Sequence, residues 1–397
     1  SSMASVPGQK FADKFFGARR PVGQARRGSI PAACDREATL PGGMQRWPNV
    51  RGLLQLGTRH PRDTPPVAVR RSDLLGQQGS HNIFLSPESR HIKMLVHILG
   101  SGAGGGFPQW NCNCRNCRRV RSGELKGPAR TQSSITVSGN GTDWVLINAS
   151  PDIREQLASF PPMQPGRAVR DTGICAILVV DAQIDHTTGL VLLREHQEPW
   201  ELYCTRAVHE DLTTGYPLIK VLSHFKGVNW HEVPVDEATF TIPKADGLVF
   251  TAVPLKSEAP PYSPHRHNTV PGNNIGLRIE DTRTGQNLFY APGLGEMEPH
   301  VHRYMENADC ILVDGTVWTD NELSLEDISD KRAQEMGHLD QSSHGGILDI
   351  LRPLACPQKF LIHINNTNPI LDEDSPEHAE VINAGIQIAY DGMDITL

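Results

Sequence analysis

Polar side chains that can bind a metal follow a short apolar run near the middle of the chain. Residues 176–180 are apolar and largely β-branched, which predicts a buried strand. Asp181–Gly189 comes next (Asp-Ala-Gln-Ile-Asp-His-Thr-Thr-Gly), and the apolar residues 190–193 then favour a helix over 188–196. Oxygen and imidazole donors at one strand exit can reach a single point in space, which a metal site requires. The pattern therefore constrains the chain to a fold in which core strands end at a polar centre.

Two later apolar runs end in the same kinds of side chain. Residues 310–313 predict a buried strand that ends at Asp314, and residues 360–362 predict another that ends at His363. Carboxylate and imidazole groups at the ends of separate core strands suit a mononuclear site that keeps coordination positions open. This favours non-haem iron over a closed zinc site. The predicted active-site residues are Asp185, His186, Asp314 and His363.

Three of the eight cysteines lie close together, at Cys112, Cys114 and Cys117. Three thiolates at this spacing can wrap one soft divalent ion, and zinc is the usual occupant. Two alternatives stay open: three unlinked thiols on a loop, or redox chemistry by the C-x-x-C pair Cys114 and Cys117. The third thiol and the lack of a thioredoxin-like context favour a structural zinc. The sequence does not identify its fourth ligand.

A proline-rich loop carries two further histidines, His265 and His267. Such a loop runs over a surface or the edge of a site, so each histidine either lines the substrate pocket or lies in solvent. His338 and His344 are similarly ambiguous. The glycine run 102–106 matches neither the dinucleotide fingerprint nor the phosphate-binding loop, so it predicts a tight turn beside the metal site and no nucleotide cofactor.

Charge is unevenly distributed along the chain. Residues 1–93 hold 15 of the 38 Lys and Arg but only 6 of the 45 Asp and Glu, and they are rich in Pro, Gly and Arg. This composition is typical of a disordered extension, and a basic arm for nucleic acid is the functional alternative. Met94 is also a candidate for the natural start. We therefore expect the fold in residues 94–397, as one domain, and no nucleic-acid partner.

From Met94 onward, short apolar runs alternate with helical segments. Strands are predicted at 95–99, 134–137, 144–147, 176–180, 200–204, 248–253, 275–279, 287–290, 310–313 and 360–364, and helices at 153–160, 188–196, 206–212, 299–306, 344–351 and 375–384. Early strands form hairpins and later ones are separated by helices. This favours an α/β fold of the α+β kind, a two-sheet sandwich flanked by helices. No secretory signal or membrane-length apolar run is visible, and the cysteines are typical of a reducing compartment, so we expect a cytoplasmic protein.

On these residues the chain resembles the pyrroloquinoline quinone (PQQ) biosynthesis protein B family, a branch of the metallo-β-lactamase superfamily. The resemblance rests on five segments, 100–114, 148–154, 181–189, 290–295 and 363–371. It implies an αββα sandwich that helps to make PQQ from a Glu–Tyr crosslinked, peptide-derived precursor, by iron-dependent hydroxylation of the tyrosine-derived ring. The alternative is an older description of the family, a carrier that moves PQQ or its precursor to the periplasm. Other PQQ-biosynthesis proteins and a second copy of the chain are candidate partners.

The chain departs from the superfamily pattern at one of its two metal positions. Asp181 and Gln183 stand where the superfamily has its two leading histidines, whereas the four active-site residues predicted above match the second position. Dinuclear hydrolysis needs a hydroxide held between two fully ligated ions, so a single iron with open positions is favoured instead. Asp181 and Gln183 are then expected to orient ligands or substrate. Related phosphodiesterases complete the zinc site of the three cysteines with a histidine where this chain has Asn366.

Overall fold

The computed structural model describes residues 93–397. The predictions for residues 1–93 therefore lie outside the described residues, except at Lys93. The first strand, β1, begins at Leu95. Met94, just before it, is fully buried, so the packed part of the described chain starts where the apolar pattern starts.

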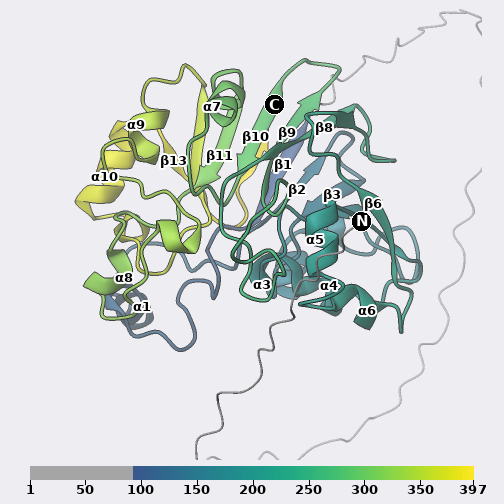
Figure 1. Ribbon diagram of the computed structural model, residues 1–397, viewed down its shortest axis with the longest axis horizontal. Helices are drawn as coiled ribbons and strands as arrows, with labels where there is room; N and C mark the ends of the chain where they lie inside the picture. The colour runs from purple at the N-terminus through teal and green to yellow at the C-terminus, as the bar shows by residue number, and fades with distance from the viewer. Residues whose placement is uncertain (1–92) are drawn as a thin grey trace, which may run out of the picture. The chain divides into compact units, whose positions relative to one another are not determined.

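Two seven-stranded sheets form the centre of this part of the chain (Figure 1). The first contains β1 (Leu95–Gly100), β2 (Ser134–Ser138), β3 (Trp144–Ile147), β4 (Ile174–Leu178), β5 (Trp200–Cys204), β6 (Val228–Glu232) and β14 (Asp394–Thr396). The second contains β7 (Thr239–Phe240), β8 (Leu248–Pro254), β9 (Ile275–Asp281), β10 (Asn287–Ala291), β11 (Cys310–Asp314), β12 (Gln358–Ile362) and β13 (Gln387–Ile388). Their orders are β14-β1-β2-β3-β4-β5-β6 and β13-β12-β11-β10-β9-β8-β7.

Strand direction in each sheet follows from the type of connection. β2 and β3 are joined by a short turn and pair antiparallel, as predicted, and β8, β9 and β10 are also antiparallel. From β3 to β6, and from β10 to β13, neighbouring strands are parallel. Parallel neighbours need a crossover connection, which the intervening helices supply.

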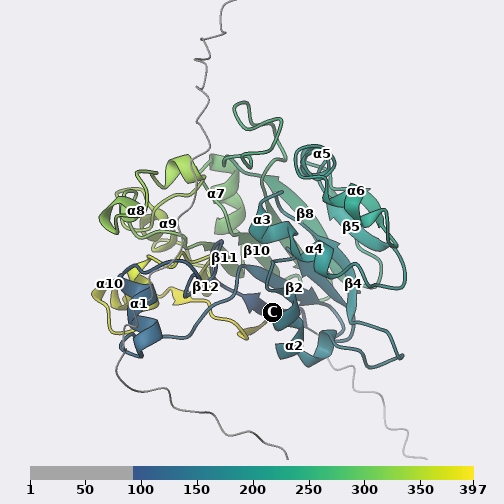
Figure 2. The ribbon, with the colours of Figure 1, turned by 90° about the horizontal axis from the view of Figure 1, so that it is seen from below.

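Helices cover the outer faces of both sheets (Figures 1 and 2). Against the first sheet pack α2 (Ile153–Ser159), α4 (Gly189–Leu192), α5 (Arg206–Asp211) and α6 (Leu218–Leu222), and against the second α7 (Pro299–Glu306), α9 (Ile347–Leu351) and α10 (Pro376–Asn383). The connections hold α1 (Arg115–Ser122), α3 (Ile184–Thr187), α8 (Glu322–Leu325) and three 3₁₀ turns, η1 (Pro161–Met163), η2 (Gln334–Met336) and η3 (Pro369–Leu371).

The main apolar core lies between the two sheets. Phe250 on β8 and Tyr290 on β10 are among its largest fully buried side chains. Central strands such as β3 and β11 are buried at every position, because helices cover the face that the core does not. Sheet against sheet, with helices outside both, is the αββα sandwich, which confirms the predicted fold class.

All ten predicted strands are present, within two residues at either end, but four strands and the helices α1, α6 and α8 were missed, and one predicted helix is misplaced. β6, β7, β13 and β14 lie at or next to sheet edges and were missed. The helix predicted over 188–196 is wrong: α3 starts earlier, at Ile184, and α4 ends at Leu192. Between them the Gly189 amide donates to the Ala149 carbonyl at 2.9 Å, and the His186 carbonyl accepts from the Ala149 amide at 2.7 Å, so neither group makes a helical hydrogen bond.

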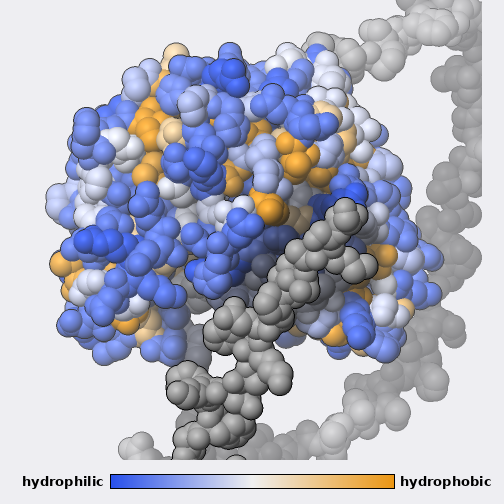
Figure 3. All heavy atoms as spheres, in the orientation of Figure 1, coloured by the Kyte–Doolittle hydropathy of each residue, from blue (hydrophilic) through white to orange (hydrophobic). Residues whose placement is uncertain are grey.

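Within residues 93–397, no helix is both long and apolar enough to cross a membrane. On the face drawn in Figure 3, hydrophobic residues form small patches separated by hydrophilic ones. Scattered apolar residues of this kind are ordinary on a folded domain surface and identify no binding face.

Candidate metal centre

A cavity of about 220 Å³ lies where β4, β11 and β12 end. Asp181, Thr316 and His363 follow these strands closely, so the strand order itself gathers their side chains at one edge of the sandwich. The polar residues that line the cavity are Asp181, Gln183, Asp185, His186, Ser257, Asn274, Thr316, His338, His363 and Asn365. The cavity therefore brings together polar and metal-binding side chains that follow three separate strands in the sequence.

Asp185, His186 and His363 face one another across this cavity, with their ligand atoms within 4.8 Å of one another. His363 Nε2 is 3.2 Å and His186 Nε2 is 3.7 Å from Asp185 Oδ2. Two ligand atoms that each lie about 2.1 Å from one ion are about 3.0 Å apart at right angles and about 3.4 Å apart at the tetrahedral angle. The three side chains thus need little movement to bind one ion. Two histidines and one carboxylate are the ligand set of non-haem Fe(II) oxygenases.

The Nε2 atom of His186 provides a second test of whether a metal fits. It is buried and has no hydrogen-bond partner among the described residues. Leaving such an atom unsatisfied costs roughly 1–3 kcal/mol, so an unpartnered atom in a native protein calls for a specific explanation. A metal ion held by Asp185 and His363 would also bind this atom, and the residues present therefore fit the metal that the sequence predicts.

Neighbouring groups fix which ring nitrogen each histidine presents to the cavity. His186 Nδ1 lies 2.8 Å and 2.9 Å from the two carboxylate oxygens of Asp181, to which it donates its proton. His363 Nδ1 lies 2.9 Å from Thr316 Oγ1 and donates to that hydroxyl. In both rings the lone pair then lies on Nε2, as a metal requires. Asp181 thus orients the imidazole of His186.

The carboxylates also control the charge of His186 and Asp185. Burial lowers the pKa of His186, but the charges of Asp181 and Asp185 outweigh it and raise the pKa to about 9. Burial raises the pKa of Asp185, yet His186 and His363 hold it below its ordinary value. Without a metal, a proton therefore occupies the triad, and binding of a metal must displace it.

Asp314 lies beside the triad with both oxygens already engaged. Oδ1 accepts hydrogen bonds from the Thr316 amide, at 2.9 Å, and hydroxyl, at 2.6 Å. Oδ2 accepts from the Leu294 amide at 2.8 Å and from His338 Nδ1 at 2.6 Å. Asp314, His338 and His363 form a second group of ligand atoms within 4.8 Å. All four of these contacts are hydrogen bonds through which the Asp314 carboxylate positions other residues. Its role as a metal ligand therefore stays a prediction.

His338 is the site residue that sequence reasoning left undecided. It follows the 3₁₀ turn η2 on a connection outside the regular elements, directly after Gly337. Its ring stacks on that of His363, with ring centroids 5.3 Å apart. Gly337 has φ +85°, where glycine is favoured, so the backbone turns just before His338.

Three other predicted residues have different outcomes. Gln183 lines the cavity, and its side-chain amide donates to the Glu258 carbonyl at 3.4 Å. His265 instead pairs with Glu210, with 2.9 Å between His265 Nε2 and Glu210 Oε2, and His267 is exposed. Neither histidine lines the cavity, so of the two alternatives left open by the sequence the structure favours a surface position for both.

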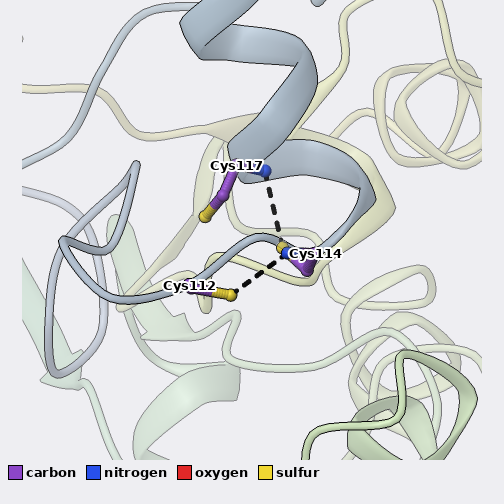
Figure 4. Close-up of side chains that lie close together, drawn as sticks. All are labelled: Cys112, Cys114 and Cys117. Atoms are coloured by element: carbon purple, nitrogen blue, oxygen red, sulfur yellow. Dashed lines mark hydrogen bonds between the residues drawn. The ribbon is translucent and has the colours of Figure 1, made fainter. Parts of the chain in front are cut away.

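The three cysteines of the predicted zinc site also converge. Cys112 and Cys114 lie on the connection before α1, and Cys117 lies in its first turn (Figure 4). Their sulfur atoms are within 4.8 Å of one another, and Cys114 and Cys117 are buried. A hydrogen bond from Cys114 lowers the pKa of Cys117 to about 7, against the opposing effect of burial. A thiolate at this place is the form that binds zinc. We call these three residues the Cys cluster.

The αββα sandwich with a metal centre at its strand ends defines a protein of the metallo-β-lactamase class. Residues 143–364 match the beta-lactamase superfamily domain. A diphosphatase of the PhnP family has the same fold, with a TM-score of 0.54 at 19% identity over 77% of this chain and 97% of that one. Within that class, the chain belongs to the coenzyme PQQ synthesis protein B family.

Several relatives establish this membership. Coenzyme PQQ synthesis protein B of Nitrosococcus oceani is 62% identical over 309 residues, which are 77% of this chain and 100% of the relative. That of Methylococcus capsulatus is 57% identical over 304 residues, again 77% and 100%. The structure of Zn²⁺-bound PqqB from Methylobacterium extorquens superimposes with a TM-score of 0.69 at 33% identity, covering 76% of this chain and all of that one. The membership supports a role in coenzyme PQQ synthesis.

Proposed function

We propose that this chain is an iron-dependent oxygenase of coenzyme PQQ synthesis that hydroxylates the tyrosine-derived ring of a Glu–Tyr crosslinked precursor. The observation that carries the proposal is the triad of Asp185, His186 and His363 at the cavity. Family membership supports the pathway, and the ligand set supports the chemistry, because two histidines and a carboxylate leave positions open for dioxygen and substrate.

In this proposal Asp185, His186 and His363 would hold Fe(II), which would supply the activation of dioxygen. The reaction would place one oxygen atom in a ring carbon–hydrogen bond, and a reductant would supply the two electrons that, with two protons, convert the other oxygen atom to water. Asp181 and Thr316 keep the Nε2 lone pairs of the two imidazoles directed at the centre. His186 and His363 are buried, which limits the access of bulk water to their rings.

The cavity wall offers groups that suit a polar aromatic ligand. Leu323 and Met336 present apolar surface on which a ring can pack. Gln183 and Asn274 each donate one amide N–H to the Glu258 carbonyl and keep a second N–H that can bind phenolic or carboxylate oxygens. The proposed substrate has both kinds of surface, a tyrosine-derived ring and glutamate-derived carboxylates.

The test is to incubate Fe(II)-loaded protein with the precursor, dioxygen and ascorbate, and to follow the precursor by mass spectrometry. We expect the mass to rise by one or more oxygen atoms, and His186→Ala to abolish the change. Zinc-loaded protein is the matched control, because zinc has no redox chemistry. If His186→Ala and wild type support PQQ production equally and bind the precursor equally, the carrier function replaces the oxygenase.

A further inference from the structure

The outer side of α1 carries three arginines that no carboxylate neutralises. Arg115, Arg118 and Arg121 are spaced three residues apart, so they lie along one side of the helix, and all three are exposed. Within residues 93–397 none of their side chains forms an ion pair, whereas Arg119 on the same helix pairs with Asp372 at 2.5 Å. An arginine without a carboxylate partner can still bind one from another molecule, often through two parallel hydrogen bonds.

An exposed tryptophan lies next to this row of arginines. The side chain of Trp110 is 86% exposed. Arg121 holds the backbone on both sides of it, because its guanidinium donates to the Gln109 and Cys112 carbonyls. The loop therefore presents the indole in a fixed place, which reduces the entropy that binding must overcome. Tryptophan and arginine are among the residue types that contribute most to affinity at protein interfaces.

Helix α8 extends the same surface. Figure 1 shows α8 beside α1, and the Arg115 amide donates to the carboxylate of Glu326, just after α8, at 2.9 Å. Leu325 and Ile328 are aliphatic, yet they are 70% and 46% exposed. Leu323, on the same helix, lines the metal cavity, so a partner seated here would touch an element of the cavity wall. We define the α1–α8 surface as Trp110, Arg115, Arg118, Arg121, Leu325 and Ile328.

The charge of the rest of the domain decides which kind of partner fits. Residues 94–397 hold the other 23 Lys and Arg but 39 of the 45 Asp and Glu, so the domain as a whole is strongly acidic. Nucleic acid and anionic membranes carry their charge over a long stretch, which the acidic remainder of the domain would repel. A short acidic segment of a protein can reach the arginines alone. Residues 1–93 are net basic and lack the complementary charge.

We propose that the α1–α8 surface is the docking site for a partner protein that presents a short acidic segment with apolar side chains. The three arginines bind the carboxylates of the segment, and the Trp110 indole packs against one of its apolar side chains. The inference goes beyond the proposed oxygenase, because docking requires neither the cavity metal nor the reaction. Added salt should weaken the complex, since the attraction acts between exposed charges.

The experiment places the photo-crosslinking amino acid p-benzoylphenylalanine at Trp110 of the full chain, in cells that make PQQ, and identifies the linked peptide by mass spectrometry. We expect a cross-link to another protein, in a segment where Asp and Glu outnumber Lys and Arg. Arg115→Glu combined with Arg118→Glu should reduce the cross-link about tenfold or more. The matched control combines Arg154→Glu and Arg303→Glu, at exposed arginines of α2 and α7 that also form no ion pair with a described residue, and it should leave the cross-link unchanged.

A binding measurement with purified protein completes the test. A synthetic peptide of the linked segment should bind wild-type protein, and its affinity should fall about tenfold or more in Trp110→Ala, or when amides replace the carboxylates of the peptide. Trp110→Ala also covers the case in which the charge-reversed variant does not fold. The proposal would be overturned by a cross-link to nucleic acid, lipid or a second copy of this chain, by equal cross-linking in the charge-reversed and wild-type proteins, or by no cross-link at all. The readout is docking, so failure of the oxygenase proposal leaves this test intact.

Discussion

Asp181→Asn tests whether the carboxylate behind His186 tunes the metal centre. Both oxygens of Asp181 lie within 2.9 Å of His186 Nδ1, and Asp181 is 5% exposed, so solvent screens the contact little. Asparagine keeps the shape and one acceptor oxygen but removes the charge, which makes the imidazole a weaker metal ligand. Loss of such a partner lowers metal affinity roughly 10–100-fold. Since tenfold is about 1.4 kcal/mol, we expect a loss of about 1.4–2.8 kcal/mol in binding free energy.

The assay is anaerobic titration of metal-free protein with Fe(II) against a chromophoric chelator, with Asp185→Ala as the variant that should bind no metal at the cavity. Asp211→Asn is the matched control. Asp211 is also a buried aspartate, but it accepts a hydrogen bond from Ser263 Oγ at 2.5 Å and does not line the cavity. Equal affinities in Asp181→Asn, Asp211→Asn and wild type would refute the role assigned to Asp181.

Three further predictions concern stability, each measured by denaturant unfolding. Phe250→Ala opens the core between the sheets and should lower the free energy of unfolding by about 3–5 kcal/mol, whereas Phe225→Ala, at a residue 49% exposed, should change it little. Gly189→Ala would normally favour a helix, but its Cβ would lie 2.3 Å from the Ser150 carbonyl oxygen, so we expect a loss of roughly 1–3 kcal/mol; a gain would contradict the packing. Burial raises the pKa of Glu322 from its ordinary value of 4.5 to about 7, so the folded state holds its proton more tightly than the unfolded state does. Glu322 therefore contributes its full share of the free energy of unfolding below about pH 4.5. This contribution should fall by about 3 kcal/mol as the pH rises through about 7, and Glu322→Gln should remove the pH dependence.

The sequence was informative wherever a side chain follows a buried strand. Asp185, His186 and His363 could be placed together because strand ends gather at one edge of a sandwich whatever the loops do. Asp314 was brought to the same edge for the same reason. Apolar runs in central strands predicted those strands well, since both of their faces are buried.

The features that could not be predicted from the sequence depend on contacts between distant segments. β14 pairs with β1 across nearly the whole described chain, and no local pattern encodes that pairing. His338 reaches the cavity from an irregular connection, where periodicity is absent. His265 and Asn366 both lie on loops, and the packing of each loop decides its contacts: His265 pairs with Glu210, whereas Asn366 faces the Cys cluster. Loop packing is a tertiary property, so residue type alone could not separate them.

The contacts of Asp181 and Gln183 also bear on the number of metals at the cavity. A dinuclear centre of this superfamily needs imidazoles at both positions, and here the Asp181 carboxylate is already engaged with His186 and with the Gln183 amide, at 2.9 Å. The Gln183 side chain donates to a backbone carbonyl. Ser257, on the cavity wall, donates its hydroxyl to the Gly337 carbonyl at 2.8 Å. These hydrogen bonds hold the walls of the cavity, and among the residues that line it only His186 has a buried side-chain nitrogen with no partner. In the proposed function these contacts favour one ion at the triad, and the second group of ligand atoms, Asp314, His338 and His363, shares His363 with it.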